Sequence, residues 1–170
     1  MPRVNTLLLI AAAAAAGLWL YMNNQATDDT SIADEQDADD MTLQNNGNNN
    51  PGNIRASDQS WLGKIADGVT SAFERFVSPE YGVRAVAIIF QNYYTRYGLD
   101  TVRDLITRYA PPSENDTENY ANFVAGRLGV SPDTPLNVPQ VLPELVAAVL
   151  QMESGTVVTP DYVRQAMQAA

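Results

Sequence analysis

A single carboxylate at the end of an apolar helical stretch is the feature of this sequence best suited to chemistry. Residues 142–155, LPELVAAVLQMESG, repeat apolar residues at the three- and four-residue spacing of one helix face, and Glu153 follows just before a glycine that can end a helix. The C-terminal end of a helix is the negative pole of its dipole, which favours a protonated carboxyl group. This position therefore predicts a general acid, with a solvated helix residue as the structural alternative.

Composition narrows the chemistry that the chain can perform. The 170 residues include no Cys and no His, and 10 basic residues stand against 20 acidic ones, for a net charge of −10. Without Cys and His there is no thiol nucleophile, no Ser-His-Asp arrangement and no common zinc site, so we expect carboxylates to carry any catalysis, without a metal or cofactor. The acidic balance argues against nucleic acid as a partner.

The N-terminal region is predicted to anchor the chain in a membrane. Residues 6–22, after a short flank of residues 1–5, contain no charge and are long enough to cross a hydrocarbon core of about 30 Å. A cleavable signal peptide is the alternative, but no small-x-small site lies close to the end of the run. With Arg3 before the run and acidic residues after it, the C-terminal domain is predicted to lie outside the cytoplasm.

The next segment, residues 23–47, is predicted to be a flexible acidic linker. It is rich in Asn and Asp and holds seven of the 20 acidic residues, with few large apolar side chains to form a core. Like charges should keep it extended. An acidic docking tail is the alternative interpretation.

Residues 48–170 are enough for one domain with its own core, and their helix signals predict a mainly α-helical fold. Ser78 and Pro79 suit a helix start, and Gly98 suits its end. Four more helices are predicted: one from about residue 100 to 110, one that opens with the polar cluster 114–118 and ends at Gly129, the Glu153 helix after the Pro-rich loop 131–139, and one that starts at residues 159–161.

The helix after Ser78 is predicted to be a core helix, and the segment before it is predicted to be irregular. A turn at residues 48–54 followed by Trp61 predicts a short hairpin or an irregular wing. Trp61 is interpreted as a core residue, with a sugar-stacking platform as the alternative. The apolar positions of the helix are Val83, Val86, Ala87, Phe90, Tyr94 and Tyr97.

Four strings in this domain resemble lysozyme-superfamily glucosaminidases and transglycosylases. They are NNNPGNI with the downstream WLGK, FVSPEY, TENYA and the helix that ends in MESG. The set also resembles phage and prophage virion proteins, through NNNPGNIR, SPEYGVRA and APPSENDTENY. The resemblance implies a lysozyme-like domain, and because the Glu-Ser-Gly string comes last here rather than first, it implies a circularly permuted chain.

The resemblance also implies roles for individual residues. Glu153 would protonate the glycosidic oxygen and Tyr120 would orient the sugar, so the two are expected to face one cleft. Asn115 or Thr117 would bind acetamido groups. The candidates for a second carboxylate beside the substrate are Glu114 and Glu80, each with an ordinary alternative as a solvated or helix-terminal charge.

These features together predict a membrane-anchored, virion-associated protein that opens the cell wall locally, as a muramidase or lytic transglycosylase. The expected partners are peptidoglycan glycan strands, membrane lipid through residues 6–22 and other virion proteins. The expected location is a virion's internal membrane or a bacterial inner membrane. The alternatives are a non-catalytic structural membrane protein that binds peptidoglycan or capsid partners, and a membrane adaptor that recruits another protein.

Overall fold

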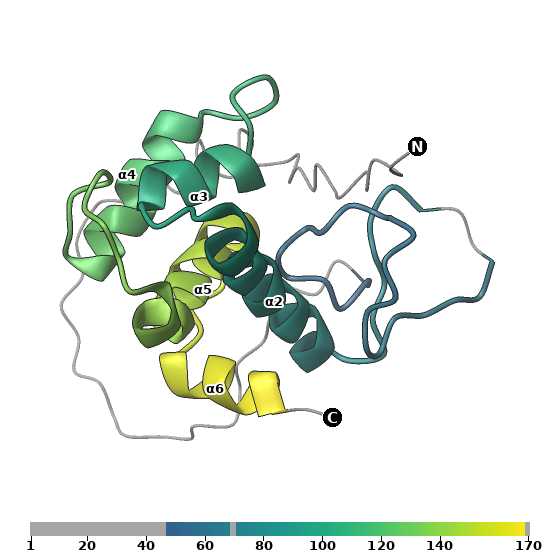
Figure 1. Cartoon of the computed structure of the whole chain (residues 1–170). Helices are drawn as coiled ribbons and strands as arrows, with labels where there is room; N and C mark the ends of the chain where they lie inside the picture. The colour runs from purple at the N-terminus through teal and green to yellow at the C-terminus, as the bar shows by residue number, and fades with distance from the viewer. Residues whose placement is uncertain (1–46, 69–70, 169–170) are drawn as a thin grey trace, which may run out of the picture.

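The structure is a computed structural model that describes residues 47–68 and 71–168 (Figure 1). The predicted flank, transmembrane helix and nearly all of the predicted linker, residues 1–46, lie outside this part of the chain. Within it, none of the helices combines the length and the apolar character that crossing a bilayer requires.

The prediction of a mainly α-helical domain is confirmed for the described residues. Between residues 79 and 168, five helices follow one another without an intervening strand: α2 (Pro79–Tyr97), α3 (Val102–Tyr109), α4 (Thr117–Leu128), α5 (Val138–Ser154) and α6 (Pro160–Gln168). Their starts carry the predicted chemistry, since Thr101 and Asp116 accept hydrogen bonds from backbone N–H groups of α3 and α4. As predicted, a glycine with a left-handed backbone conformation ends each of α2, α4 and α5.

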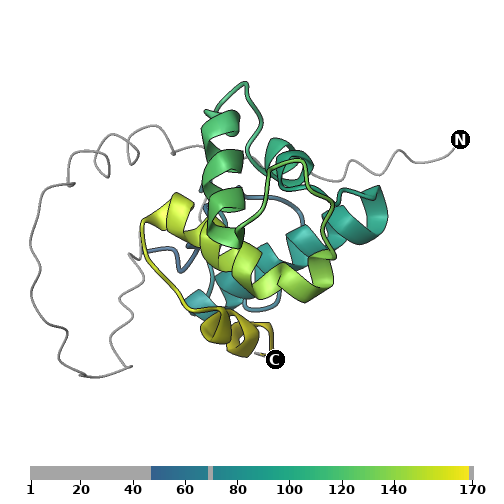
Figure 2. The same ribbon diagram turned by 90° about the vertical axis from the view of Figure 1, so that its left-hand side faces the viewer.

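Helices α2 and α5 pack against each other at the centre of the domain (Figures 1 and 2). The α3–α4 pair lies on one side of them and α6 on the other. Burial of apolar side chains between these layers stabilises the fold by roughly 1.5–3 kcal/mol for each large side chain. The core includes Val83, Val86, Phe90, Leu105, Ile106, Tyr109, Tyr120, Leu145, Val149 and Leu150.

The buried face of α2 differs from the predicted one at its C-terminal end. Tyr93 is buried there, whereas Tyr94 is half-buried and Tyr97 is 43% exposed. Tyr93 follows Val86 and Phe90 at helical spacing and packs edge-on against Phe90. The predicted core face is therefore correct up to Phe90, holds in part for Tyr94, which packs against the edge of the core, and is wrong for Tyr97.

Helix α5 begins before the end of the loop predicted for residues 131–139. It starts at Val138, with Pro139 in its first turn and Pro143 inside it. Proline is well tolerated in a first turn, where the backbone N–H has no helical partner. Pro143 removes one hydrogen bond, yet it lies in the buried face, so tertiary packing overrides the local cost.

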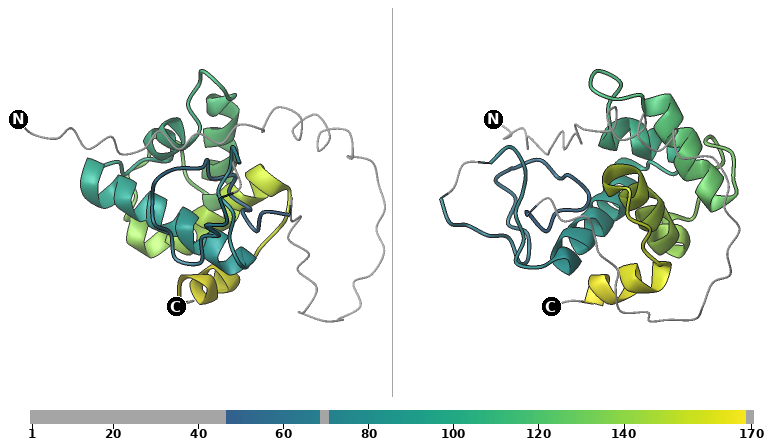
Figure 3. Two further views of the ribbon diagram at one scale, coloured as in Figure 1. Left: turned by 90° about the vertical axis from the view of Figure 1, so that its right-hand side faces the viewer. Right: turned by 180° about the vertical axis from the view of Figure 1, so that it is seen from behind.

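The segment before α2 is an irregular wing, which comprises the described residues from 47 to 77 (Figure 3). Only two isolated antiparallel bridges occur in it, Arg55 with Phe73 and Lys64 with Phe76, so the hairpin alternative is not formed in the described residues.

The first turn of the wing lies directly against α2. A Cβ atom on Gly82 would overlap the carbonyl oxygen of Asn49 and lie 2.8 Å from Cδ of Pro51. Similarly, a Cβ atom on Gly52 would lie 2.9 Å from the Tyr109 hydroxyl. Two glycines therefore let the turn approach the helices closely enough to carry its side chains toward the end of α5.

Candidate active site

The Glu153 carboxyl group is buried at the C-terminal end of α5, where three segments meet. Its residue is 6% exposed. The Tyr120 hydroxyl on α4 donates to Oε1 over 2.9 Å, and the Asn53 side-chain amide in the wing donates to Oε2 over 3.0 Å. The predicted proximity of Glu153 and Tyr120, 33 positions apart in sequence, is thus observed as a direct hydrogen bond.

Asn53 reaches Glu153 because the wing turn is held in a fixed shape. The Asn50 side chain bonds both the N–H and the carbonyl of Ile54, and its amide also donates to the Glu74 carbonyl. Asn53 itself adopts a left-handed backbone, with φ of 48°, which Asn tolerates better than most residues. The sequence analysis identified this turn but missed the contact of Asn53 with Glu153.

Tyr109 on α3 supports the same turn through its side chain. Its hydroxyl donates to the Gly52 carbonyl over 2.5 Å, and its ring packs on Phe90 at a centroid distance of 5.0 Å. Burial and the nearby Glu153 carboxylate raise the pKa of Tyr109 well above its ordinary value. The neutral hydroxyl therefore remains a donor that holds the residue preceding Asn53.

The surroundings of Glu153 favour its protonated form. Burial raises the pKa of Glu153 to about 7, against the opposite effect of the hydrogen bonds from Asn53 and Tyr120. Desolvation is thus the larger influence. A carboxyl group with this pKa holds a proton on about half of the molecules at neutral pH, as a general acid requires.

The other predicted substrate residues take different positions. The buried Thr117 hydroxyl donates to the Ala110 carbonyl and so stabilises the start of α4. The Asn115 amide donates to the Pro111 carbonyl, while its Oδ1 is buried without a hydrogen-bond partner in the described part of the chain. Asn115 therefore keeps one unused acceptor, whereas the Thr117 hydroxyl proton is already used within the domain.

Neither predicted second carboxylate bonds with Glu153. Glu114 is exposed and pairs with Arg55, which joins the wing to the loop before α4. Glu80 lies in the first turn of α2 and accepts a hydrogen bond from Tyr162 on α6. Its pKa is lowered, chiefly by the Ser78 side chain, so Glu80 is an ordinary helix N-terminal carboxylate.

Trp61 is a half-buried residue of the wing that packs against the core, as its favoured interpretation predicted. Its indole Nε1 is buried without a hydrogen-bond partner in the described part of the chain. The backbone carbonyl of Trp61 accepts a hydrogen bond from Lys64, which places it in the outer turn of the wing.

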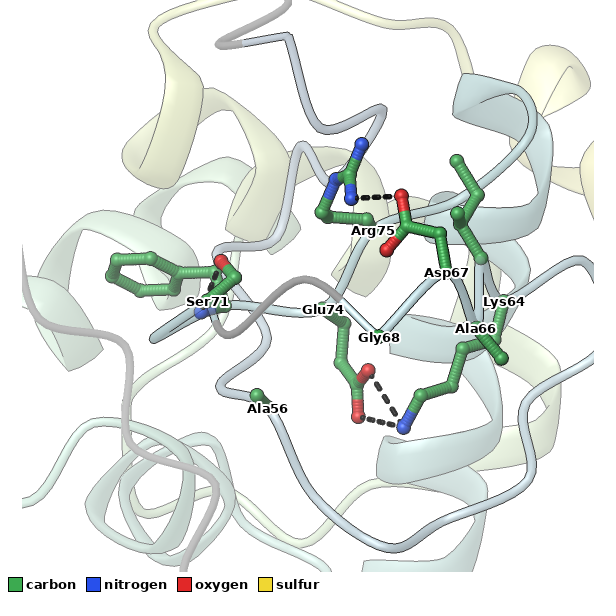
Figure 4. A pocket seen from close by; sticks show the side chains of 10 residues that line it. Ala56, Lys64, Ala66, Asp67, Gly68, Ser71, Glu74 and Arg75 are labelled. Atoms are coloured by element: carbon green, nitrogen blue, oxygen red, sulfur yellow. Dashed lines mark hydrogen bonds and ion pairs between the residues drawn. The ribbon is translucent and has the colours of Figure 1, made fainter.

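A second buried carboxylate, which the sequence analysis did not identify, lies in the wing. Glu74 is 2% exposed, pairs with Lys64 at 2.9 Å and accepts hydrogen bonds from the backbone and hydroxyl of Ser57. Both residues line a cavity of about 280 Å³ in which Arg75 also pairs with Asp67 (Figure 4). Because these charges are paired with one another, they hold the wing together.

The described residues contain no cluster of side chains that could hold a metal ion. Glu153 accepts hydrogen bonds from Tyr120 and Asn53, and its carboxyl group is one that can exchange a proton near neutral pH.

Sequence comparison places this chain in a family of phage proteins. It is 39% identical over 112 residues to a phage protein, and the matched region spans 64% of this chain and 69% of the relative. That relative is Protein P5 of Pseudoalteromonas phage PM2, and the chain belongs to the Protein P5 family. No protein-family model matches the chain. The predicted resemblance to phage proteins is therefore confirmed.

Proposed function

We propose that this phage protein is virion-associated and cleaves the glycan strands of peptidoglycan, with Glu153 as the general acid. The observation that carries the proposal is the buried Glu153 carboxyl group, whose pKa of about 7 lies close to a neutral working pH. The resemblance of its helix to the catalytic helix of lysozyme-like enzymes supplies the reaction class. The lysozyme-like, permuted fold is part of this proposal.

In the proposed reaction, Glu153 gives its proton to the glycosidic oxygen as the bond from that oxygen to the sugar carbon breaks. Tyr120 is fully buried, so we assign it the role of positioning the carboxyl group and not of contacting the sugar. Its hydroxyl can donate to the carboxylate or turn to accept from the protonated acid. Tyr120 can thus support Glu153 in both protonation states.

The side chains that bond the Glu153 carboxyl group, Tyr120 and Asn53, are neutral, and this favours a mechanism with one carboxylate. Glu114 is paired with Arg55, and Glu74 is paired with Lys64. The transglycosylases that this chain resembles use the acetamido oxygen of the substrate to stabilise the sugar carbon. Attack by water or by a sugar hydroxyl would then return a proton to Glu153 and complete hydrolysis or transglycosylation.

A glycan can reach Glu153 only when the wing turn moves. The carboxyl group is covered by Asn53, and the nearby Arg55–Glu114 ion pair links the wing to the loop before α4. Asn53 is half-buried and Arg55 and Glu114 lie at the surface, so displacement of this turn requires no opening of the helical core. In the opened site, the unused Oδ1 of Asn115 is proposed to accept from an acetamido N–H.

The test is mass analysis of the soluble products after incubation of the full chain with purified peptidoglycan. A transglycosylase releases muropeptides with anhydro ends, and a hydrolase releases muropeptides with reducing ends. Absence of any released glycan fragment, from protein that is folded by circular dichroism, contradicts the proposal.

A non-catalytic role in the virion is the second candidate, and the burial of the site favours it. Hydrogen bonds from Tyr120 and Asn53 to a covered carboxyl group also serve to join α4, α5 and the wing. This alternative predicts that the wild type and Glu153→Gln bind insoluble peptidoglycan equally and that neither releases fragments.

The uncharged N-terminal run is proposed to anchor the domain formed by residues 48–170. Residues 6–22 would span the membrane and residues 23–47 would act as a tether. The full chain should stay with membranes after an alkaline wash, and deletion of residues 6–22 should release it. Release of the full chain by the same wash contradicts an anchor.

A further inference from the structure

An arginine on α3 stacks on two tyrosines near the end of α2 and forms no ion pair among the described residues. The Arg108 guanidinium lies 3.8 Å from the centre of the Tyr97 ring and 5.0 Å from that of Tyr93. Tyr93 is buried and packs edge-on against both Phe90 and Tyr97. The aromatic rings therefore fix the guanidinium by cation–π contacts without neutralising its charge.

Arg84, Arg96, Arg108 and Arg127 form no ion pair among the described residues, and of these four Arg108 is the one that stacks on aromatic rings. Among the described residues, Arg55, Lys64, Arg75, Arg103 and Arg164 all form ion pairs. Arg108 forms none. Asp104 stands one turn earlier on α3, but it forms a capping interaction with Thr101.

Two polar atoms in this cluster are buried without a hydrogen-bond partner in the described part of the chain. They are Nε of Arg108 and the hydroxyl oxygen of Tyr93. Burial raises the pKa of Tyr93 to about 12, so its hydroxyl keeps its proton at physiological pH. The neighbouring Arg108 guanidinium acts to lower that pKa, so the two groups lie close together. The cluster thus presents a fixed positive charge that no carboxylate of the described residues pairs, and an anionic acceptor is the group that would satisfy it.

We propose that Arg108, held by Tyr93 and Tyr97, is a binding site for a carboxylate group. A guanidinium presents two parallel N–H groups that match the two oxygens of a carboxylate. The partly exposed Tyr97 ring adds a flat apolar surface suited to the face of a sugar. The ligand class is accordingly a sugar acid, and its assignment to the muramic acid of peptidoglycan rests on the proposed function.

The location of this carboxylate site connects it with the candidate active site. Arg108 adjoins Tyr109, which contacts Phe90 through its ring and Gly52 through its hydroxyl. Gly52 directly precedes Asn53, the residue that bonds Glu153. Arg108 is therefore joined to the turn that covers the acid through its neighbour Tyr109.

The experiment uses the full-length Glu153→Gln variant, so that cleavage does not affect the measurement. The Arg108 Nε–Hε signal is followed by NMR during titration with N-acetylmuramic acid, and with N-acetylglucosamine, which lacks the carboxylate. We expect a saturable shift with the first sugar only, and roughly ten- to a hundredfold weaker binding after Arg108→Gln. Arg127→Gln, which removes an arginine outside the cluster, should bind as the parent does.

A second source of carboxylate is the chain itself, since residues 28–40 hold seven acidic side chains. Replacing these by Asn and Gln tests this source. The Arg108 signal could shift on this replacement before any sugar is added. That result would support a carboxylate site at Arg108 and identify the acidic segment as its ligand. Tighter sugar binding by the same variant would support that assignment.

The proposal is overturned if neither N-acetylmuramic acid nor neutralisation of the acidic segment changes the Arg108 signal. It is also overturned if Arg108→Gln and Arg127→Gln bind the sugar acid equally. Arg108→Lys is a second variant that can be used if the Gln variant does not fold. It keeps the charge but not the planar guanidinium, and it should bind more weakly than the parent. Because none of these results depends on cleavage, they are separate from the test of the enzyme.

Discussion

At the scale of single residues, two opposing effects decide the protonation state of the Glu153 carboxyl group. Burial disfavours the charged carboxylate, whereas the hydrogen bonds from Asn53 and Tyr120 favour it. Burial is the stronger effect, so the pKa lies above its ordinary value. A solvated helix-end glutamate, which was the structural alternative, would have neither the covered position nor the two donors.

The Tyr120→Phe variant should raise the pKa of Glu153 above about 7, because it removes one donor to the charged form. The expected rise is roughly one pH unit, since a hydrogen bond to a charged group is worth about 1.5–3 kcal/mol. Carboxyl ¹³C NMR titration measures it. Tyr162→Phe is the matched control, because Tyr162 donates in the same way to Glu80. A Tyr120→Phe titration that overlays the wild type would show that this bond is not formed.

At the scale of elements, the position of the acid depends on how closely the wing turn approaches α2. Gly82 on α2 and Gly52 in the turn both lie where a methyl group would collide with neighbouring atoms. Because interiors are close-packed, the turn would have to shift to accommodate it. The shift would displace Asn53, which follows Asn50 by three residues and Gly52 by one.

The Gly82→Ala variant should be destabilised by about 1–3 kcal/mol, because its Cβ would overlap the Asn49 carbonyl. Gly126→Ala is a matched helical control whose Cβ would meet open space, and it should be neutral or stabilising by up to about 1 kcal/mol. Urea unfolding monitored by circular dichroism compares the two. Equal stability of both variants would contradict the close packing of the wing turn on α2.

The helices could be predicted from the sequence because their signals are local. Pro79 and Gly98 mark the ends of α2, and Asp116 marks the start of α4, within a few residues of the periodic segments. The early start of α5 was missed because Pro139 was interpreted as part of a loop, although proline also suits a first turn.

The site could be predicted only in part, because its contacts join distant segments. The string resemblance led to Glu153 and Tyr120, and their hydrogen bond is observed. Asn53 stands 100 positions before Glu153, and no local pattern marks such a contact. The burial of Glu74 depends in the same way on the folding of the wing, which has no periodic pattern to read.

At the scale of the whole molecule, the buried acid links stability to pH. A folded-state pKa of about 7 stands above the ordinary value of 4.5, so the folded state binds the proton more tightly than the unfolded state does. The stabilisation is fully present below about pH 4.5 and is lost as the pH rises through about 7. Glu80 and Asp133, whose pKa values are lowered, act in the opposite direction at lower pH.

The difference in unfolding free energy between the wild type and Glu153→Gln should therefore change by roughly 3 kcal/mol between pH 4 and pH 8, with the wild type losing stability relative to the variant. Taking the difference cancels the contributions of Glu80 and Asp133, which both proteins share. Urea unfolding at closely spaced pH values measures it. A pH-independent difference would mean that Glu153 titrates as an exposed residue.

The most direct measurement is the clearing of a peptidoglycan suspension by the wild type, Glu153→Gln and Glu144→Gln. Glu144 lies on the same helix, where it forms an exposed ion pair with Arg164, so its replacement controls for the loss of a carboxylate from α5. The proposed role of Glu153 predicts clearing by the wild type and Glu144→Gln, and a rate at least about a hundredfold lower for Glu153→Gln. Equal clearing by the wild type and a folded Glu153→Gln protein would contradict it.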